Sequence, residues 1–139
     1  MPPEIHNFFD SYRDAFNLLS GARVAAHYAE PSAIAQGGVF TLWSTRREVE
    51  ANMNDLCEQY TARGFVGTSY RPRPFIVQGD GYVVADLLWR IEWRDEAPWE
   101  FGTTYNLVRS PQGWRVLLCT AYQEDQLQAA RAAVTPERP

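Results

Sequence analysis

The chain has little cysteine and only two histidines. Its two cysteines, Cys57 and Cys119, belong to no C-x-x-C motif and have no other cysteine or histidine close by in the sequence. Disulfide scaffolds and zinc sites both need such clusters, so neither class fits. Isolated free cysteines usually act as small buried hydrophobic residues. We therefore expect no metal, no cofactor and a cytoplasmic location.

Positive charge and long apolar runs are scarce as well. The formal net charge is -4, which argues against binding to nucleic acid, because that needs a basic surface. No run of Lys or Arg would form a membrane patch, and no apolar stretch approaches the roughly 18 residues of a membrane span. The first residues, MPPEIHNFFDSYRD, lack the basic start of a secretory signal. We therefore expect neither nucleic acid nor membrane as a partner.

What the chain does have is apolar and aromatic residues, which make up 45% and 14% of its 139 positions. A chain of this size buries a core of its own. Residues 4–19 space their apolar side chains at three- and four-residue steps, which predicts a helix. A short second helix is expected over 22–29, an extended segment with a glycine pair over 32–43, and a third helix with a capping box over 44–64.

The second half of the chain shows the two-residue period of strands. Two strands flank the turn QGDG within residues 71–93, and two more flank the turn SPQG within residues 100–123. Residues 124–139 are expected to add a closing helix and a tail to a core of about residues 4–123. Helices followed by a meander of antiparallel strands predict one α+β domain over residues 1–139.

The strand at residues 82–93 has one wholly apolar face. Its odd positions are Val83, Ala85, Leu87, Trp89, Ile91 and Trp93. Side chains alternate across a strand, so Asp86 points the other way, together with Arg90 and Glu92. We predict that Asp86 forms a salt bridge on that second face, for example with the cross-strand Arg115, and that it is not catalytic.

The last two strands are apolar at both odd and even positions. Those positions include Tyr105, Leu107, Val108, Trp114, Val116, Leu117, Leu118, Cys119, Ala121 and Tyr122. A sheet that is apolar on both faces needs cover on both, and the helices supply only one layer. We therefore expect a homodimer in which a second subunit covers the other face of the sheet.

Four segments resemble the nuclear transport factor 2-like (SnoaL-like) proteins. They are SYRDAF at residues 11–16, HYAEP at 27–31, STRREVEANM at 44–53 and YNLVRSPQGWRV at 105–116. The resemblance covers about residues 5–123. It implies a cystatin-like cone, in which a strongly curved antiparallel sheet wraps around the N-terminal helices and leaves an apolar pocket. Many members dimerise through the convex face of the sheet.

The resemblance also implies candidate site residues. The tyrosine that the family's ketosteroid isomerases use to bind an oxyanion falls at Tyr12, and their second donor falls near Asn106. Their general base falls near Gln36, whose amide cannot accept a proton. By the same alignment Asn106 lies on the concave face. The predicted ligand pocket consists of Tyr12, Trp43, Leu87, Trp89, Asn106 and Cys119.

Two functions remain open. One is a protein that binds a small hydrophobic ligand in an enclosed apolar pocket, or only presents a surface to a partner, without catalysis. The other is a SnoaL-like isomerase, cyclase or dehydratase that acts on a small hydrophobic carbonyl compound, with Tyr12 and Asn106 as hydrogen-bond donors. The dehydratases rely on paired His and Tyr groups, but His27 ends a helical segment and is interpreted as a surface or capping residue. The missing base favours the first function.

Overall fold

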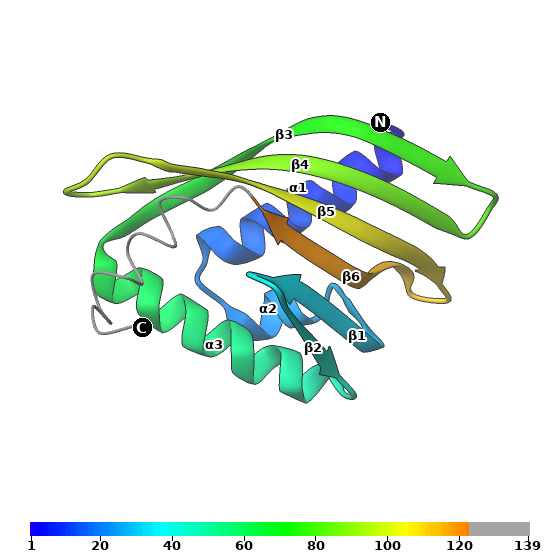
Figure 1. Cartoon of the computed structure of the whole chain (residues 1–139), viewed down its shortest axis with the longest axis horizontal. Helices are drawn as coiled ribbons and strands as arrows, with labels where there is room; N and C mark the ends of the chain where they lie inside the picture. The colour runs from blue at the N-terminus through cyan, green and yellow to red at the C-terminus, as the bar shows by residue number, and fades with distance from the viewer. Residues whose placement is uncertain (123–139) are drawn as a thin grey trace.

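The computed structural model describes residues 1–122, which form a curved sheet wrapped around helices (Figure 1). The helices are α1 (Pro3–Asn17), α2 (Gly21–Ala25) and α3 (Arg46–Arg63). The strands are β1 (Tyr28–Gln36), β2 (Val39–Trp43), β3 (Phe65–Gln78), β4 (Tyr82–Trp93), β5 (Trp99–Ser110) and β6 (Gly113–Tyr122). The predicted α+β class is confirmed, whereas the helix expected over residues 124–139 lies outside the described residues. No helix in the described part of the chain is long and apolar enough to cross a membrane.

The strands form one sheet in the order β2-β1-β6-β5-β4-β3. Neighbouring strands are antiparallel except β1 and β6, which run parallel. This parallel pair is an addition to the antiparallel arrangement that the sequence predicts. The helices lie on the concave side of the curved sheet (Figure 1), so the core lies between the helices and that face.

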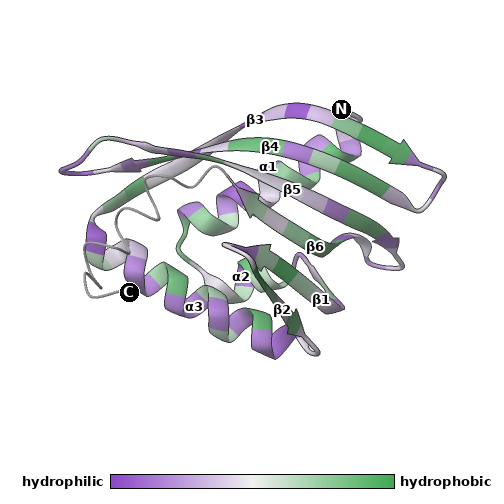
Figure 2. Cartoon of the chain, viewed as in Figure 1, coloured by the Kyte–Doolittle hydropathy of each residue, from purple (hydrophilic) through white to green (hydrophobic). Residues whose placement is uncertain are grey.

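Helix α1 packs through one apolar stripe. Ile5, Phe9, Tyr12 and Ala15 are all buried. They lie three or four residues apart, which is the spacing that predicts this helix. Helix α3 is mostly hydrophilic with separated hydrophobic positions (Figure 2), because it covers the core from one side and faces water on the other.

Helix α3 begins and ends at the residues that its capping signals indicate. The Glu48 N–H donates to Thr45 Oγ1 at 3.3 Å and the Thr45 N–H donates to Glu48 Oε2 at 3.0 Å, which completes a capping box. Gly64 ends the helix with a φ of 89°, a conformation that glycine adopts without strain. Helix α2 is shorter than predicted, because Tyr28 already belongs to β1 and pairs there with Val116.

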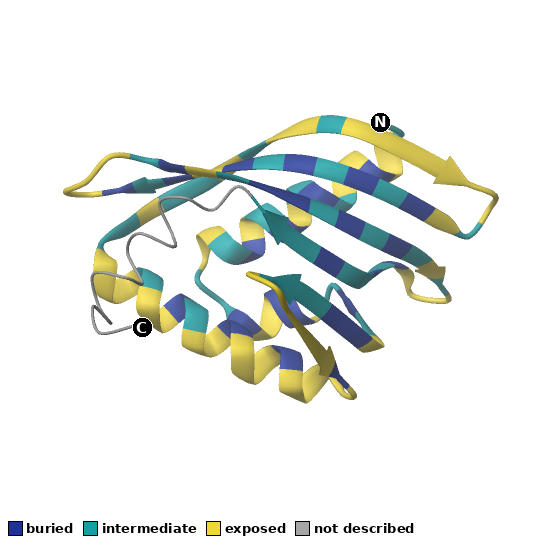
Figure 3. Ribbon diagram, in the orientation of Figure 1, coloured by how far each residue is buried: buried dark blue, intermediate teal, exposed yellow. Residues whose placement is uncertain are grey.

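The face predicted for β4 is confirmed. Its odd positions from Val83 to Trp93 are all buried, none being more than 5% exposed. Buried and less buried residues alternate along the strand (Figure 3). Ala85 and Leu87 are completely buried at the centre of the concave face.

A bulge explains why β6 is apolar at both odd and even positions. The register of β6 with β5 shifts by one residue at Leu117, which lies between two paired positions. Val116 and Cys119 therefore both point to the concave face although they lie three residues apart, and both are buried. A simple two-residue count cannot assign the faces of such a strand.

Asp86 lies on the convex face, as predicted, and forms an ion pair there. Arg73 Nε lies 3.5 Å from Asp86 Oδ2, and the Thr104 and Tyr122 hydroxyls donate to Asp86 Oδ1. The partner is thus Arg73 and not Arg115, which donates to a backbone carbonyl in β6 instead. An irregularity in the pairing of β3 with β4 brings Arg73 to this position, and the sequence offers no sign of it.

Candidate functional site

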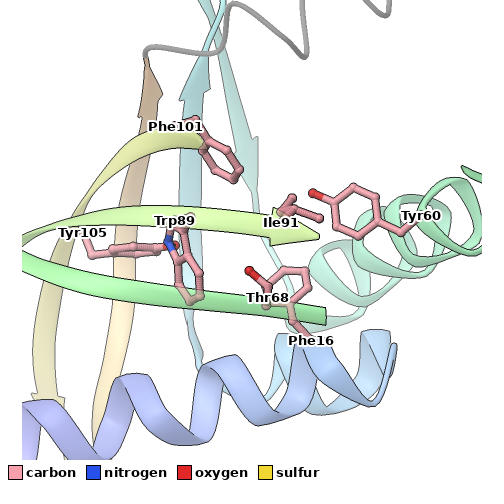
Figure 4. A pocket seen from close by; sticks show the side chains of 7 residues that line it. All are labelled: Phe16, Tyr60, Thr68, Trp89, Ile91, Phe101 and Tyr105. Carbon is pink, nitrogen blue, oxygen red and sulfur yellow. The ribbon is translucent and has the colours of Figure 1, made fainter. Parts of the chain in front are cut away.

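A cavity of about 50 Å³ lies between the sheet and the C-terminal ends of α1 and α3. Its walls are Phe16, Tyr60, Thr68, Trp89, Ile91, Phe101 and Tyr105, which come from both helices and three strands and surround a common space (Figure 4). This volume holds about one or two water molecules. It is far below the roughly 300 Å³ at which sites for drug-sized ligands begin. Aromatic rings therefore fill most of the hollow that the curved sheet encloses.

Tyr105 brings a polar group to the cavity wall. The Trp89 indole Nε1–H donates to the Tyr105 hydroxyl at 3.0 Å, and both side chains are buried. The two residues lie on the neighbouring strands β4 and β5, on the concave face. The sequence analysis did not single out Tyr105, because its orientation depends on the register of β5, which the pattern alone does not determine.

A chain of hydrogen bonds continues from Tyr105 into the core. The Tyr12 ring lies edge-on to Tyr105 with 5.6 Å between the ring centroids, and the two phenols shift each other's pKa. The Tyr12 and Tyr28 hydroxyls lie 2.7 Å apart, and the Tyr28 hydroxyl lies 3.5 Å from Cys119 Sγ. An indole N–H can only donate, and each hydroxyl has one proton. A hydroxyl oxygen can accept two hydrogen bonds, so the protons run either from Tyr105 through Tyr12 and Tyr28 to the sulfur, or in the opposite order from the thiol to Tyr105. In the first order every hydroxyl proton of the series is in use, and in the second the Tyr105 proton is left for a partner in the cavity.

These buried groups are uncharged at neutral pH. Burial raises the pKa of Tyr12, Tyr28 and Tyr105 well above the ordinary 10.0, because an anion would lose its water. Burial likewise raises the pKa of the Cys119 thiol from 9.0 to about 11. The chain can exchange hydrogen bonds with a ligand, but none of its members is a base at neutral pH.

Five of the six predicted pocket residues meet in one core cluster. Tyr12, Trp43, Leu87, Trp89 and Cys119 are all buried in it. Of these, Trp89 is in the cavity wall, whereas the others pack behind it. Trp43 reaches the cluster through the Tyr28 ring, whose centroid lies 5.8 Å away.

Asn106 lies apart from this cluster. It pairs with Val84 on β4 and with Leu118 on β6, so it shares the convex face with Asp86. Its neighbour Tyr105 takes the concave position. The expectation that Asn106 faces the pocket is corrected, because the register places the phenol and not the amide inside.

Gln36 and His27 supply no base to the cavity. Gln36 pairs with Ala121 at the end of β1 and is half-buried, and its amide does not accept protons near neutral pH. His27 is half-buried beside α1, where the Ser11 hydroxyl and His27 Nε2 lie 2.9 Å apart and His27 Nδ1 donates to the Arg23 carbonyl. Burial lowers the pKa of His27 below 6.5. It is neutral at pH 7 and bonded on both ring nitrogens.

Polar bonds also close the seam between α1 and the edge strand β3, next to the cavity. The Tyr70 hydroxyl donates to Asp10 Oδ1 at 2.7 Å. The Asn17 amide accepts from the Thr68 N–H at 2.7 Å and donates to the Thr68 carbonyl at 3.2 Å. Sequence reasoning missed this seam, because the paired residues lie more than 50 positions apart in the chain.

Comparison with protein families gives one match, which covers nearly the whole chain. The family model described as "NTF2-like protein (DUF6841)" matches residues 3–124. No curated protein matches the chain significantly.

Solved structures with this fold are numerous and distant in sequence. An NTF2-like protein with a cystatin-like fold from Novosphingobium aromaticivorans superposes with a TM-score of 0.72 at 18% identity, over 93% of this chain and 85% of that one. An NTF-2 like protein of unknown function from Shewanella oneidensis gives 0.72 at 11% identity, over 85% and 95%. A ketosteroid isomerase-like protein from Erwinia carotovora gives 0.66 at 14% identity, over 85% and 92%. At these identities the likeness shows a shared fold.

Proposed function

The chain belongs to the NTF2-like family described as DUF6841, and from that membership we propose that it binds a small, uncharged, largely apolar molecule in the cavity beside Trp89 and Tyr105. The ligand is held without being chemically changed. The observation that carries this proposal is the buried chain of hydroxyls that reaches the cavity wall at Tyr105. The fold is common to proteins of many activities, so the residues around the cavity, and not the fold, support this function.

The direction of the hydrogen bonds in this series of hydroxyls determines which ligands bind. Tyr105 accepts one hydrogen bond from Trp89, and we propose that it gives its own proton to Tyr12, so that the series of hydroxyls runs toward Cys119. Its oxygen keeps capacity for one further donor. A ligand hydroxyl can donate there without breaking an existing bond, whereas a carbonyl would have to take the Tyr105 proton away from Tyr12. We therefore expect hydroxyl compounds to bind better than the matching ketones or hydrocarbons.

The cavity must widen to admit such a ligand. Phe16, Tyr60 and Phe101 form its outer wall and are only half-buried, so we propose that these rings move when a ligand enters. Trp89, Ile91 and Tyr105 form the buried inner wall, which remains in place. A single six-membered ring with one hydroxyl is the size that this movement suits.

Calorimetric titration with phenol, cyclohexanol, cyclohexanone and toluene tests the proposal. Phenol and cyclohexanol should bind more tightly than cyclohexanone and toluene by about fivefold, since a net hydrogen bond contributes roughly 1 kcal/mol. Tyr105→Phe should abolish this preference. The control Tyr70→Phe, which removes a hydroxyl at the seam, should keep it. Equal affinities for phenol and toluene in the unchanged protein would refute the proposed ligand class.

A catalytic role on a carbonyl compound is the alternative function, and it lacks a base. None of the seven residues that line the cavity in the described part of the chain is Asp, Glu or His. Asn106, the second donor of that mechanism, lies on the other face of the sheet. Incubation of cyclohexanone with the protein in deuterated water should give no exchange of its α-protons above the buffer rate. Faster exchange would favour the enzyme.

We also propose that two copies pair through the convex face. Four large apolar residues on that face are each more than half exposed: Phe40, Leu42, Ile76 and Tyr82. The register places them on the same side as Asp86, with Phe40 and Leu42 at one edge of the sheet and Ile76 and Tyr82 at the other. A second copy that lies across the convex face would cover both edges. Light scattering after size exclusion should give the mass of a dimer, and Leu42→Glu should give a monomer. Leu18→Glu, at a similarly exposed residue just after α1, should leave the dimer intact.

A cytoplasmic location remains a proposal as well. Both cysteines are free and buried, as expected of a protein in a reducing compartment. Fractionation of cells that express the protein would test it.

A further inference from the structure

A second and larger hollow lies at the opposite end of α1. It measures about 520 Å³ and is lined by Pro2, Glu4, Ile5, Val77, Gly79, Asp80, Val83, Arg109 and Trp114. The start of α1 here meets the turn between β3 and β4, near the N-terminus in Figure 1. Its volume lies within the usual range of small-molecule sites, and it shares no lining residue with the cavity beside Trp89. We call it the Arg109 groove.

Arg109 is held rigidly in this groove. Its guanidinium lies over the Trp114 ring, 4.5 Å from the centroid. Arg109 Nε–H donates to the Asp80 carbonyl at 3.1 Å and the Arg109 backbone N–H donates to the Gly81 carbonyl at 2.9 Å. The register of β5 with β6 pairs Arg109 with Trp114, so the sheet itself maintains the stacking. A guanidinium fixed in this way loses little freedom when it binds an anion.

A carboxylate of the chain already occupies the outer edge of this guanidinium. Arg109 Nη2 donates to Glu4 Oε1 at 3.2 Å. The pair is weak, since the two side chains are 49% and 53% exposed and water screens them. Glu4 lies in the first turn of α1, whose N-terminus has no side-chain cap and favours a negative group nearby. The position thus suits a carboxylate, and the one in place is easily displaced.

The remaining walls limit what else can bind. Val77, which is 55% exposed, gives the groove an apolar side, with Val83 and Ile5 buried behind it. Asp80 and Glu4 add two negative charges to the rim beside the single Arg109. A doubly charged phosphate would meet both carboxylates, whereas one carboxylate on an apolar tail meets the guanidinium with its head and the valines with its chain.

We propose that the Arg109 groove binds a monocarboxylate with an apolar tail, such as a medium-chain fatty acid. The ligand carboxylate replaces Glu4 on Arg109, and the tail lies along Val77 and Val83. This site is separate from the cavity proposed above, so either can fail without the other.

Titration with octanoate, followed by calorimetry and by the indole N–H signals in NMR, tests the proposal. Octanoate should shift the Trp114 indole signal and leave the Trp89 signal in place. Arg109→Gln should weaken binding by at least about tenfold, since a hydrogen bond to a charged group contributes more than a neutral one. Glu4→Gln should strengthen binding by about two- to fivefold, because it removes the competing carboxylate.

A matched control lies at the other end of the sheet. Arg63 lies over the Trp99 ring at 4.8 Å and pairs with Glu96 at 3.0 Å, so Arg63→Gln removes the same kind of stacked arginine. That variant should bind octanoate as the unchanged protein does. Octanol binding as tightly as octanoate, Glu4→Gln weakening the binding, or Arg63→Gln matching Arg109→Gln would each overturn the proposal.

Discussion

Beneath the centre of the concave face lie three phenols, an indole and a thiol, all buried and in contact with one another. On the convex face the polar centre is Asp86 with Arg73, Thr104 and Tyr122, all partly exposed. The two networks lie back to back on neighbouring positions of the same strands. Burial excludes charge from one of them, and contact with water permits it in the other. The cavity beside Trp89 and Tyr105 is therefore suited to uncharged ligands.

The largest effect is expected when a charge is placed on the concave face, or removed from the convex face, at adjacent residues of β4. Leu87 is completely buried, so Leu87→Asp should lower the free energy of unfolding by about 4 kcal/mol or more, because the new carboxylate has no partner there. Asp86→Leu should cost less than about 1.5 kcal/mol, since its site is partly exposed. Urea unfolding of both variants measures the difference. Similar losses would contradict the assignment of the faces.

The next largest effect is expected in the pH dependence of stability, which reports on the buried network. The folded pKa of Cys119 is raised from 9.0 to about 11, so the unfolded chain loses this proton first as the pH rises. Stability should hold below pH 9 and fall between pH 9 and 11, by about 2–3 kcal/mol from the thiol alone. The phenols, whose pKa values burial also raises, steepen the loss. Cys119→Ala should make the decline shallower, and an unchanged curve would exclude the thiol.

His27 should give a separate loss of stability at the acidic end of the pH range. Burial lowers its folded pKa below the ordinary 6.5. The unfolded chain then binds a proton that the folded chain does not, and stability should fall as the pH drops below about 6.5. His27→Gln should reduce this acid slope and leave the alkaline limb as it was.

Removing one hydroxyl from each network gives a smaller effect. Tyr12→Phe removes the hydroxyl that lies between Tyr105 and Tyr28 and leaves the buried Tyr28 hydroxyl without this partner, so it should destabilise the protein by about 1–3 kcal/mol. Tyr122→Phe removes a hydroxyl that water can replace at Asp86, and should cost about 1 kcal/mol or less. Thermal unfolding of the pair compares them directly. A larger loss for Tyr122→Phe would reverse the comparison.

The smallest change is expected from the ion pair of the convex face. Arg73 and Asp86 are 33% and 23% exposed, so Arg73→Gln should alter stability by less than about 1 kcal/mol, and less again in high salt. Urea unfolding at low and high salt measures it. A loss above about 2 kcal/mol would mean that Asp86 is buried in solution, for example beneath a second copy.

The sequence predicts one of these faces well and the site only in part. The alternation along β4 identifies Ala85, Leu87 and Trp89 as buried, because a regular strand repeats every two residues. The bulge at Leu117 interrupts that repeat in β6, and the register of β5 decides between Tyr105 and Asn106. Both depend on pairing between distant strands, which a local pattern does not contain.

The cavity and the Arg109 groove were harder still to predict. Each is formed by side chains from three or more elements, and a volume depends on how their rings pack. Composition and spacing indicate which residues are inside, but not which of them leave a space. The family resemblance indicates Tyr12, which lies in the buried network behind the cavity and not in its wall.

A crystal structure of the protein with bound phenol tests the central claim most directly. We expect the phenol ring among Phe16, Tyr60 and Phe101, with its oxygen about 3 Å from the Tyr105 hydroxyl and the bonds from Trp89 to Cys119 preserved. A ring bound elsewhere, or one whose oxygen points away from Tyr105, would contradict the account.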